Sequence, residues 1–388
     1  MSALLERALA DSDAPSAREA RRGGLRAALR AIADGPLARL ADDIDRRGVY
    51  PREILEQVGA AGGLGAHLAL GGTQEPDLGA GIEAIAEISR VCGSTGFLMW
   101  CQAVCGLYME QSGNPAQGGA ALAAIASGSA LGGTGMSNPM KTFAGIETML
   151  LRAKPDPSGD GFLVDGALPW VSNLGPDHRF GAVARVVGAE GEPEREIMFI
   201  ARGDGPGVEL RGCPTFSAME GTNTFAVRFT RARIGRDDLV ADPVRPFVGR
   251  IRAAFVLLQC GFGLGVAQGA IDSMRTVERA LGHVNVFLDE RPDDLQPELD
   301  LLRARTLRLA DDPFAQDAGA VADVLDARAE ASEIALRAAQ SALLHAGARG
   351  YVMTSPVQRR VRESHFVAIV TPALKHLRKE IARLRAGS

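Results

Sequence analysis

The stretch from residue 132 to 141 combines groups that suit a polar ligand. Its sequence, GGTGMSNPMK, offers several free backbone N–H groups, the hydroxyl of Thr134 and the cation of Lys141. Backbone N–H groups in such a loop can bind a phosphate or the polar edge of a cofactor. A simple surface turn remains the alternative for a loop of this composition.

A second stretch, residues 165 to 173, suits a stacked ring. Trp170 is one of only two tryptophans in the chain, and it stands beside Ser172 and Asn173. An aromatic face next to small hydrogen-bonding side chains can hold a planar ligand, whereas a lone tryptophan is more often a core residue. The two stretches together indicate a ligand site in the middle of the chain.

Other chemistries find little support in the sequence. Cys101 and Cys105 lie one helical turn apart without a nearby histidine, so we interpret them as core thiols and predict no metal site. The chain contains no HExxH pair, no G-x-S-x-G elbow and no P-loop. The GFGLG run at 261–265 lies within a helical pattern, which favours close helix packing over dinucleotide binding.

The composition excludes several classes of protein. With 43 basic and 47 acidic residues the net charge is −4, so no basic excess predicts nucleic-acid binding. Five cysteines in 388 residues indicate reduced thiols and a cytoplasmic protein, and the N-terminus lacks a signal-peptide core. The apolar run 253–271 is interrupted by Gln259 and Gln268, which favours a buried helix over a membrane span.

The elements that must position these groups follow a helix–strand–helix order, which predicts an α+β multidomain chain. From about residue 129, short apolar runs alternate with Gly, Pro and Asp, a pattern typical of an antiparallel β domain. Apolar periodicity and alanine content predict helices at 17–33, from Pro51 to about 61, 77–92, 97–109, 247–281, 295–310, 318–346 and 371–385. Prolines at 292, 297, 313 and 356 are expected to separate or cap the last four. We predict domains at 1–128, 129–243 and 244–388.

In this order the motifs resemble those of the acyl-CoA dehydrogenase superfamily, over nearly the whole chain. No single motif is decisive, but their order and spacing agree with the predicted plan. The matching segments are 45–53 with 62–65, Thr134, 170–173 (WVSN), 265–268 (GVAQ), 347–351 (GARGY) and 356–362 (PVQRRVR).

The resemblance implies an N-terminal helical domain, a middle β-barrel and a C-terminal helical bundle, in a homo-oligomer that is a dimer or tetramer. It also implies FAD between the β domain and the C-terminal helices, with FMN or a diffusible reduced flavin as alternatives. By this resemblance Trp170 packs near the flavin ring and Ser172 hydrogen-bonds near N5. The backbone at Thr134 and Met136 faces the pyrimidine edge. The helix that contains Phe97 and Trp100 lines the substrate pocket, together with residues 216–221.

The chain departs from the family at positions that do chemistry. The glutamate that removes the substrate's α-proton in most members falls on Thr371, which has no carboxylate. The alternative position used by some members falls near Phe255 and Val256. The arginine that contacts the FAD diphosphate falls on Leu281.

Two cations are candidate replacements at the diphosphate. Lys141 stands where the family has the serine of a G-S-D loop. Arg349 lies in the segment that matches the family's glycine-rich motif at 347–351.

Three hypotheses follow from these departures. The first is oxidation of an acyl-CoA-like small molecule, with hydride transfer to flavin N5 and an unusual base, for which Glu363 and His365 are candidates. The second is a two-component monooxygenase that receives reduced flavin from a separate reductase and uses O₂, with His365 near the lost base. The third is a non-catalytic scaffold protein. Alternative interpretations are a helix-surface ion pair for Glu363 and a buried or capping residue for His365.

Overall fold

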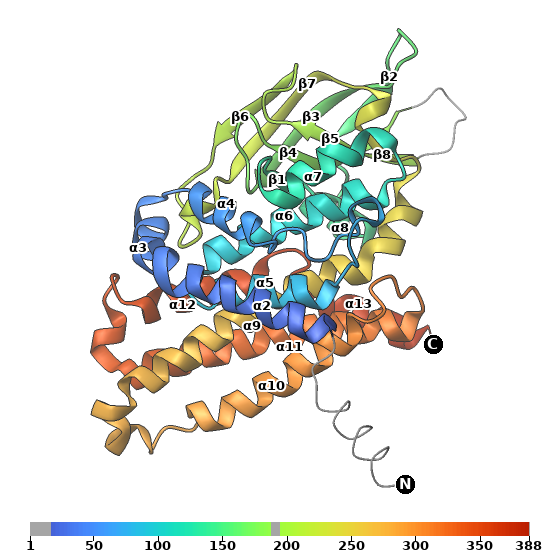
Figure 1. The fold of residues 1–388 in the computed structure, drawn as a ribbon. Coiled ribbons are helices and arrows are strands. Elements are labelled where there is room, and N and C mark those ends of the chain that lie inside the picture. Colours follow the sequence, from blue (N-terminus) through green and yellow to red (C-terminus); the bar gives the residue numbers. More distant parts are fainter. Residues whose placement is uncertain (1–16, 188–194, 388) are drawn as a thin grey trace, which may run out of the picture.

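The computed structural model describes residues 17–187 and 195–387 of the chain. Figure 1 shows helices from the first part of the chain beneath a sheet, with long helices from the last part packed against them. This arrangement confirms the predicted α+β class.

The first part of the described chain is helical. Most of the predicted helices are present with bounds shifted by a few residues. Asp77 begins one of them by accepting a hydrogen bond from the backbone N–H of Ala80. The helices are α2 (Ala17–Ile32), α3 (Ala38–Arg47), α4 (Arg52–Ala60), α5 (Leu78–Ser89), α6 (Gly93–Gln111) and α7 (Gly119–Ser127).

The middle part forms an eight-stranded sheet with its own apolar core. The strand order is β6-β7-β3-β2-β4-β5-β8, and β1 pairs with β4. Pairing is antiparallel as predicted, except that β1–β4 and β2–β4 are parallel. A short helix, α8 (Ser137–Phe143), follows β1. The strands are β1 (Gly132–Thr134), β2 (Arg152–Pro155), β3 (Phe162–Val171), β4 (Arg179–Val186), β5 (Arg195–Arg202), β6 (Val208–Gly212), β7 (Phe225–Ile234) and β8 (Leu239–Ala241).

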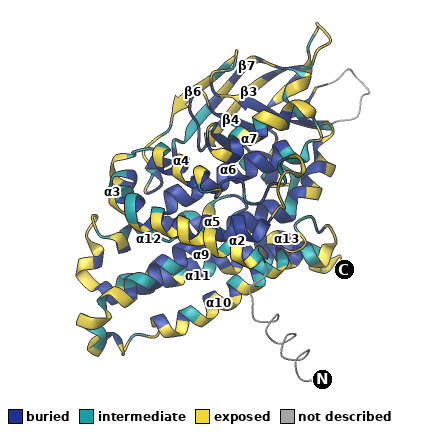
Figure 2. Ribbon diagram, viewed as in Figure 1, coloured by how far each residue is buried: buried dark blue, intermediate teal, exposed yellow. Residues whose placement is uncertain are grey.

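The last part is a helical bundle whose inner faces are buried (Figure 2). Pro356 separates α11 from α13, as expected, and it lies in the first turn of a helix outside the predicted ranges, which Ser355 caps. One proline expectation was wrong. Pro297 does not interrupt α10 but lies inside it. The helices are α9 (Val244–Asn285), α10 (Pro292–Leu309), α11 (Ala318–Ala346), α12 (Pro356–Ile369) and α13 (Leu374–Ala386).

Helix α9 is the centre of the molecule and packs against both α5 and α11. A Cβ atom on Gly261 or Gly265 would collide with backbone carbonyls of α5, and one on Gly263 would collide with Ala331 of α11. The GFGLG run therefore serves close helix packing, as predicted. By length and composition α9 could cross a membrane, but 94% of its most apolar window is buried inside the protein.

Candidate flavin site

Asn173, the last residue of the WVSN motif, joins three parts of the protein. Its Nδ2 donates to the carbonyl of Gly132 in β1 over 2.7 Å, and the hydroxyl of Tyr50 donates to its Oδ1 over 2.6 Å. Its backbone N–H donates to the carbonyl of Thr222 over 2.9 Å. The residue is fully buried and has a φ of 61°, a conformation that asparagine tolerates better than most residues. Asn173 thus fixes the end of the motif to β1 and to the N-terminal helices.

Gln102 of α6 is hydrogen-bonded to the first residue of β1 and to the segment that precedes it. Its Nε2 donates to the carbonyls of Ile125 and Ala130, each over 2.8 Å, and its Oε1 accepts from Gly132 N over 2.7 Å. Because the amide is fully buried and every polar group is satisfied, it orders β1 against α6.

Thr134, predicted at the flavin edge, ends β1 beside α6. Its hydroxyl shares a hydrogen bond of 2.8 Å with the hydroxyl of Tyr108, whose pKa burial raises well above the usual value. The Thr134 side chain is therefore engaged with α6, which leaves its backbone as the group available to a ligand. Met136, two residues further on, is buried.

Trp170 is not a core residue, because 57% of its side chain is exposed at the end of β3. It meets Phe216 edge to face, with ring centroids 6.3 Å apart. An exposed indole at the end of a strand can offer an aromatic face to a planar ligand.

Ser172 begins a chain of hydroxyl groups. Its Oγ lies 2.7 Å from Thr224 Oγ1, which lies 2.8 Å from Thr222 Oγ1. The Thr222 hydroxyl in turn donates to the carbonyl of Met219 over 2.6 Å. Because Thr222 uses its proton on a carbonyl, Thr224 donates to Thr222 and Ser172 donates to Thr224. The single proton of Ser172 is therefore used within the chain, and its oxygen is left to accept a hydrogen bond at the Trp170 end.

Thr371, which stands where the family's base is expected, lies beside the first turn of α8. Its hydroxyl shares a hydrogen bond of 2.9 Å with Ser137, and its carbonyl accepts from Gln259 Nε2 over 3.2 Å. The threonine is buried. The C-terminal segment thus reaches the loop that follows β1, but it places a neutral hydroxyl there.

Arg328 of α11 is a residue that the sequence reading missed. It is fully buried, and its guanidinium donates to Gln259 Oε1 and to the carbonyl of Val367, each over 2.7 Å, and also to Ser332 Oγ. Burial lowers its pKa to about 10. Through Gln259 this cation is linked to the backbone of Thr371. An arginine within an alanine-rich buried helix is the signal that was available in the sequence.

Glu363 is not the surface ion pair considered above, since only 2% of it is exposed. Its Oε1 accepts from the backbone N–H of Gly93, the first residue of α6, over 2.8 Å. Burial raises the pKa of this carboxyl, against the opposing charges of Arg359 and Arg360. The carboxyl therefore satisfies a helix terminus, and its oxygen is engaged with α6.

Three arginines of the 356–362 motif connect α12 to the N-terminal helical part of the chain. Arg359 donates to the carbonyl of Val91 and Arg360 to that of Arg90, each over 2.9 Å, at the C-terminus of α5. Arg362 donates to Asp45 Oδ1 over 2.7 Å, which joins the last motif to the first.

His365 is exposed on α12, so neither the buried nor the capping alternative describes it. The next residue, Phe366, meets Phe97 edge to face, with centroids 4.9 Å apart. Within residues 17–187 and 195–387, no hydrogen bond, ion pair or ring contact links His365 to Trp170 or Thr371. A catalytic role for His365 stays a prediction.

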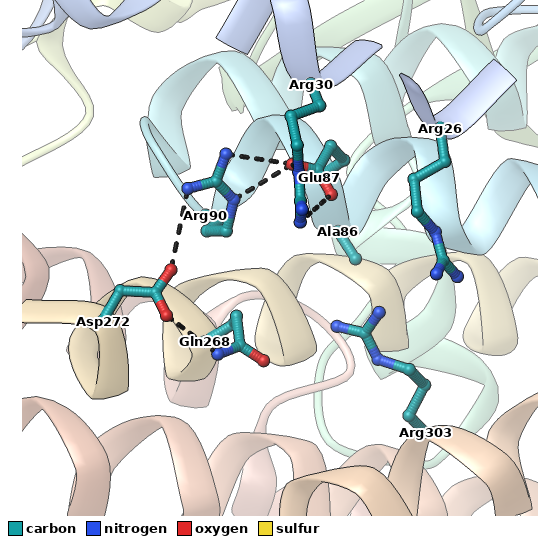
Figure 3. A pocket seen from close by; sticks show the side chains of 8 residues that line it. All are labelled: Arg26, Arg30, Ala86, Glu87, Arg90, Gln268, Asp272 and Arg303. Atoms are coloured by element: carbon teal, nitrogen blue, oxygen red, sulfur yellow. Dashed lines mark hydrogen bonds and ion pairs between the residues drawn. The ribbon is translucent and has the colours of Figure 1, made fainter. Parts of the chain in front are cut away.

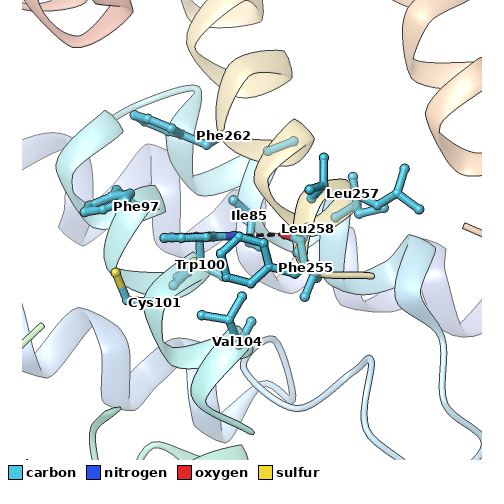
Figure 4. Packing of buried hydrophobic residues seen from close by; sticks show 14 of the residues in the cluster. Ile85, Phe97, Trp100, Cys101, Val104, Phe255, Leu257, Leu258 and Phe262 are labelled. Atoms are coloured by element: carbon cyan, nitrogen blue, oxygen red, sulfur yellow. Dashed lines mark hydrogen bonds between the residues drawn. The ribbon is translucent and has the colours of Figure 1, made fainter. Parts of the chain in front are cut away.

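Phe97 and Trp100, predicted to line a substrate pocket, belong to a buried aromatic cluster between α6 and α9 (Figure 4). Their rings stack with centroids 5.5 Å apart, and Trp100 meets Phe255 edge to face at 5.2 Å. The indole N–H of Trp100 donates to the carbonyl of Phe255 over 3.3 Å. Phe255, which falls at the alternative glutamate position, is thus part of the same cluster.

The two candidate diphosphate cations differ in their surroundings. Lys141 pairs with Glu147, with Nζ 2.9 Å from Oε1. Arg349 is exposed in the turn Gly347–Tyr351, and among the described residues no carboxylate pairs with it. Both lie outside the aromatic cluster, and neither contacts Trp170.

Comparison with known sequences finds similarity to acyl-CoA dehydrogenases. Residues 21–129 match the model of the acyl-CoA dehydrogenase N-terminal domain. The probable acyl-CoA dehydrogenase YngJ of Bacillus subtilis is 25% identical over 366 residues, which cover 88% of this chain and 92% of that protein. The human mitochondrial short-chain specific acyl-CoA dehydrogenase is 26% identical, with 88% and 84% covered.

Solved structures agree in fold. The butyryl-CoA dehydrogenase from Megasphaera elsdenii superimposes with a TM-score of 0.83 at 16% identity, with 94% of this chain and 98% of that chain covered. The dibenzothiophene monooxygenase TdsC from Paenibacillus sp. A11-2 gives 0.78 at 15% identity, with 94% and 97% covered. KijD3, in complex with FMN and a dTDP-linked amino sugar, gives 0.77 at 21% identity, with 97% and 95% covered.

Helices, a central sheet and a helical bundle in this order define the acyl-CoA dehydrogenase fold. Residues 21–129 match the acyl-CoA dehydrogenase N-terminal domain, and the chain as a whole has the acyl-CoA dehydrogenase fold.

Proposed function

We propose that this protein is a flavin-dependent oxidoreductase, and that the exposed Trp170 is the wall on which the flavin ring packs. The observation that carries the proposal is the indole that stands 57% exposed beside the Ser172 hydroxyl chain. The residues fit a flavin because an apolar ring face and a hydrogen-bonding group lie at the same sheet edge. The superfamily relatives and the FMN named in the KijD3 structure support this assignment.

Flavin, when bound, supplies the redox chemistry, and the chain supplies orientation. Asn173 holds the backbone of the WVSN motif in register with β1. Ser172 offers its hydroxyl oxygen to the ring as an acceptor. The backbone of Thr134 and the N–H of Met136 are available to its polar edge, whereas the Met136 carbonyl accepts from Met140 N. For the diphosphate we propose Arg349, because Lys141 already has a carboxylate partner.

For the reaction itself we propose oxygen-dependent oxidation of a small organic substrate, with reduced flavin supplied by a separate reductase. Removing an α-proton from an acyl thioester needs a base, and the residue at that place, Thr371, offers a hydroxyl bonded to Ser137. The carboxylate of Glu363 is not placed to act as this base, because it accepts a hydrogen bond from the backbone N–H at the start of α6. The similarity in fold to a dibenzothiophene monooxygenase supports this proposal.

Acyl-CoA dehydrogenation is the second candidate function. It is favoured by the similarity to dehydrogenases along 88% of the chain. It requires a base that the Thr371 region lacks, and His365 is the remaining candidate. The aromatic cluster of Phe97, Trp100 and Phe255 occupies the space between α6 and α9, which points to a short acyl group under this alternative.

One experiment separates these functions. The purified protein is incubated in one arm with FAD and butyryl-CoA, and in the other with FMN or FAD, a flavin reductase with NADH, O₂ and an aromatic sulfide or indole. Oxygenated product in the second arm, with no bleaching of FAD in the first, supports the monooxygenase. Bleaching of FAD by butyryl-CoA supports the dehydrogenase and refutes the monooxygenase. Failure to bind any flavin refutes both and favours the scaffold protein.

We further propose that the protein is a cytoplasmic homo-oligomer. Large apolar side chains are exposed on the C-terminal bundle, where a second copy would bury them. They are Val284, Val286, Phe287, Leu344, Tyr351, Val352 and Met353. Arg349 lies among the last of these, so a partner subunit would bring it to a neighbouring flavin. Light scattering on wild type and on Phe287→Ser tests this, since only the variant is expected to dissociate.

A further inference from the structure

A cavity of about 200 Å³ opens between α2, α5, α9 and α10, away from the flavin site. Four arginines line it, together with two carboxylates. The space is several times the roughly 30 Å³ that one water molecule occupies in the liquid. The lining residues are Arg26, Arg30, Ala86, Glu87, Arg90, Gln268, Asp272 and Arg303.

The charges are balanced at one end of the cavity. Arg90 donates to Glu87 over 3.0 Å and lies 3.6 Å from Asp272, and it also reaches Asp34 outside the cavity. Gln268 donates to Asp272 over 3.0 Å. This end therefore needs no further anion.

At the other end the residues that line the cavity are mainly arginines. Arg26 and Arg303 both lie beside Glu83, which Arg26 bonds directly and from which Arg303 stands 3.9 Å away, and the charges of Asp300 and Glu87 also act on Arg303. The Nε of Arg303 is buried and has no hydrogen-bond partner in the described part of the chain. Arg30 uses Glu87, which it shares with Arg90. Figure 3 shows the guanidinium groups of Arg26 and Arg303 extending toward each other from α2 and α10.

Two neighbouring guanidinium groups with one carboxylate between them repel each other unless an anion joins them. Burial lowers the pKa of Arg303, and the charge of Arg26 lowers it further, while Glu83 opposes that effect. Guanidinium groups bind phosphate-type oxyanions through parallel N–H···O bonds, which suits three arginines that face one cavity.

We propose that this cavity is a binding site for a phosphate-type dianion, held by Arg26, Arg30 and Arg303. The anion would satisfy the unpaired Nε of Arg303 and join α10 to α2. The site is separate from the proposed flavin site, and its ligand is either free inorganic phosphate or the phosphate of a small metabolite.

Isothermal titration of the full chain with inorganic phosphate, and separately with AMP, tests the proposal at constant ionic strength. The test variant is Arg303→Gln. The control is Arg305→Gln, which removes the same charge from α10, where Arg305 pairs with Asp326 and Glu330 outside the cavity. We expect saturable binding that weakens at least tenfold in Arg303→Gln and stays unchanged in Arg305→Gln.

The two ligands distinguish the sources. Binding of inorganic phosphate indicates the free ion, and binding of AMP alone indicates a phosphate ester. If Arg303→Gln fails to fold, Arg30→Gln replaces it, because Arg30 is largely exposed and is expected to tolerate the change. Absence of saturable binding of both ligands to wild type overturns the proposal. So does binding that no cavity variant weakens, or that Arg305→Gln weakens equally.

Discussion

Replacing Asn173 by alanine tests whether the WVSN motif positions the flavin wall through this buried amide. The change removes the hydrogen bonds to Gly132 O, to Tyr50 OH and, at 3.3 Å, to Gln102 Oε1. At a net value of about 1 kcal/mol for each bond, their loss costs about 3 kcal/mol. Alanine at a φ of 61° adds about 1 kcal/mol of backbone strain.

The total expected loss in the free energy of unfolding is therefore about 4 kcal/mol for Asn173→Ala and about 3 kcal/mol for Asn173→Gly, which avoids the strain. Asn223 is the matched control, because its φ is also positive, at 44°, and its side chain has no hydrogen bond among the described residues. Asn223→Ala is expected to lose only the backbone contribution, about 1 kcal/mol.

Urea denaturation followed by circular dichroism gives these free energies, and fluorescence titration with FAD and FMN gives affinity. Because Trp170 and Ser172 directly precede Asn173, flavin affinity should fall in both Asn173 variants and stay unchanged in Asn223→Ala. Losses below about 1 kcal/mol in both Asn173 variants, or wild-type flavin affinity in them, would refute the positioning role.

Three further outcomes are expected. Trp170→Ala should weaken flavin binding by about two- to tenfold with unchanged thermal stability, measured by titration, since a ring contact contributes about 0.5–1.5 kcal/mol; unchanged affinity removes Trp170 from the site. His365→Ala should lower turnover more than Glu363→Gln, and the reverse order would contradict the choice of His365. Burial lowers the pKa of His67 to about 4. The unfolded chain, in which His67 has its ordinary pKa of about 6.5, therefore binds a proton on this residue more tightly than the folded protein does. Between pH 7.5 and pH 5 the free energy of unfolding of wild type should fall by about 2 kcal/mol relative to that of His67→Gln, as measured by urea denaturation. Parallel pH profiles of the two proteins would refute this.

Much of the fold could be predicted from the sequence because its signals are local. The bounds of α11 agree with the predicted 318–346, where alanine content and Asp317 mark a helix and its start. Helix α12 was missed because Pro356 suggested a break, although proline is equally suited to a first turn. A local pattern does not decide between these two roles.

The site was less predictable, because burial and pairing are set by tertiary contacts. The sequence indicated Trp170 and Ser172, but it gave no sign that Gln102 would join Gly132 of β1 to Ile125, Ala130 and Asn173 through four hydrogen bonds. Glu363 was interpreted as a surface residue because its partner, Gly93, lies far away in the sequence. Arg328 carries a charge on the buried, alanine-rich face of α11, and only packing shows that it reaches Gln259.

The residues that resemble the family and those that depart from it do different things. Asp45 and Arg362, from the first and last motifs, form an ion pair, and Asn173 joins the sheet to the N-terminal helices. These residues hold the framework and the wall for a ring. The departures at Thr371 and Phe255 fall where a carboxylate would remove a proton. Because the framework can stay the same while the acid–base group changes, similarity to acyl-CoA dehydrogenases shows the fold here, and the groups at those positions decide the reaction.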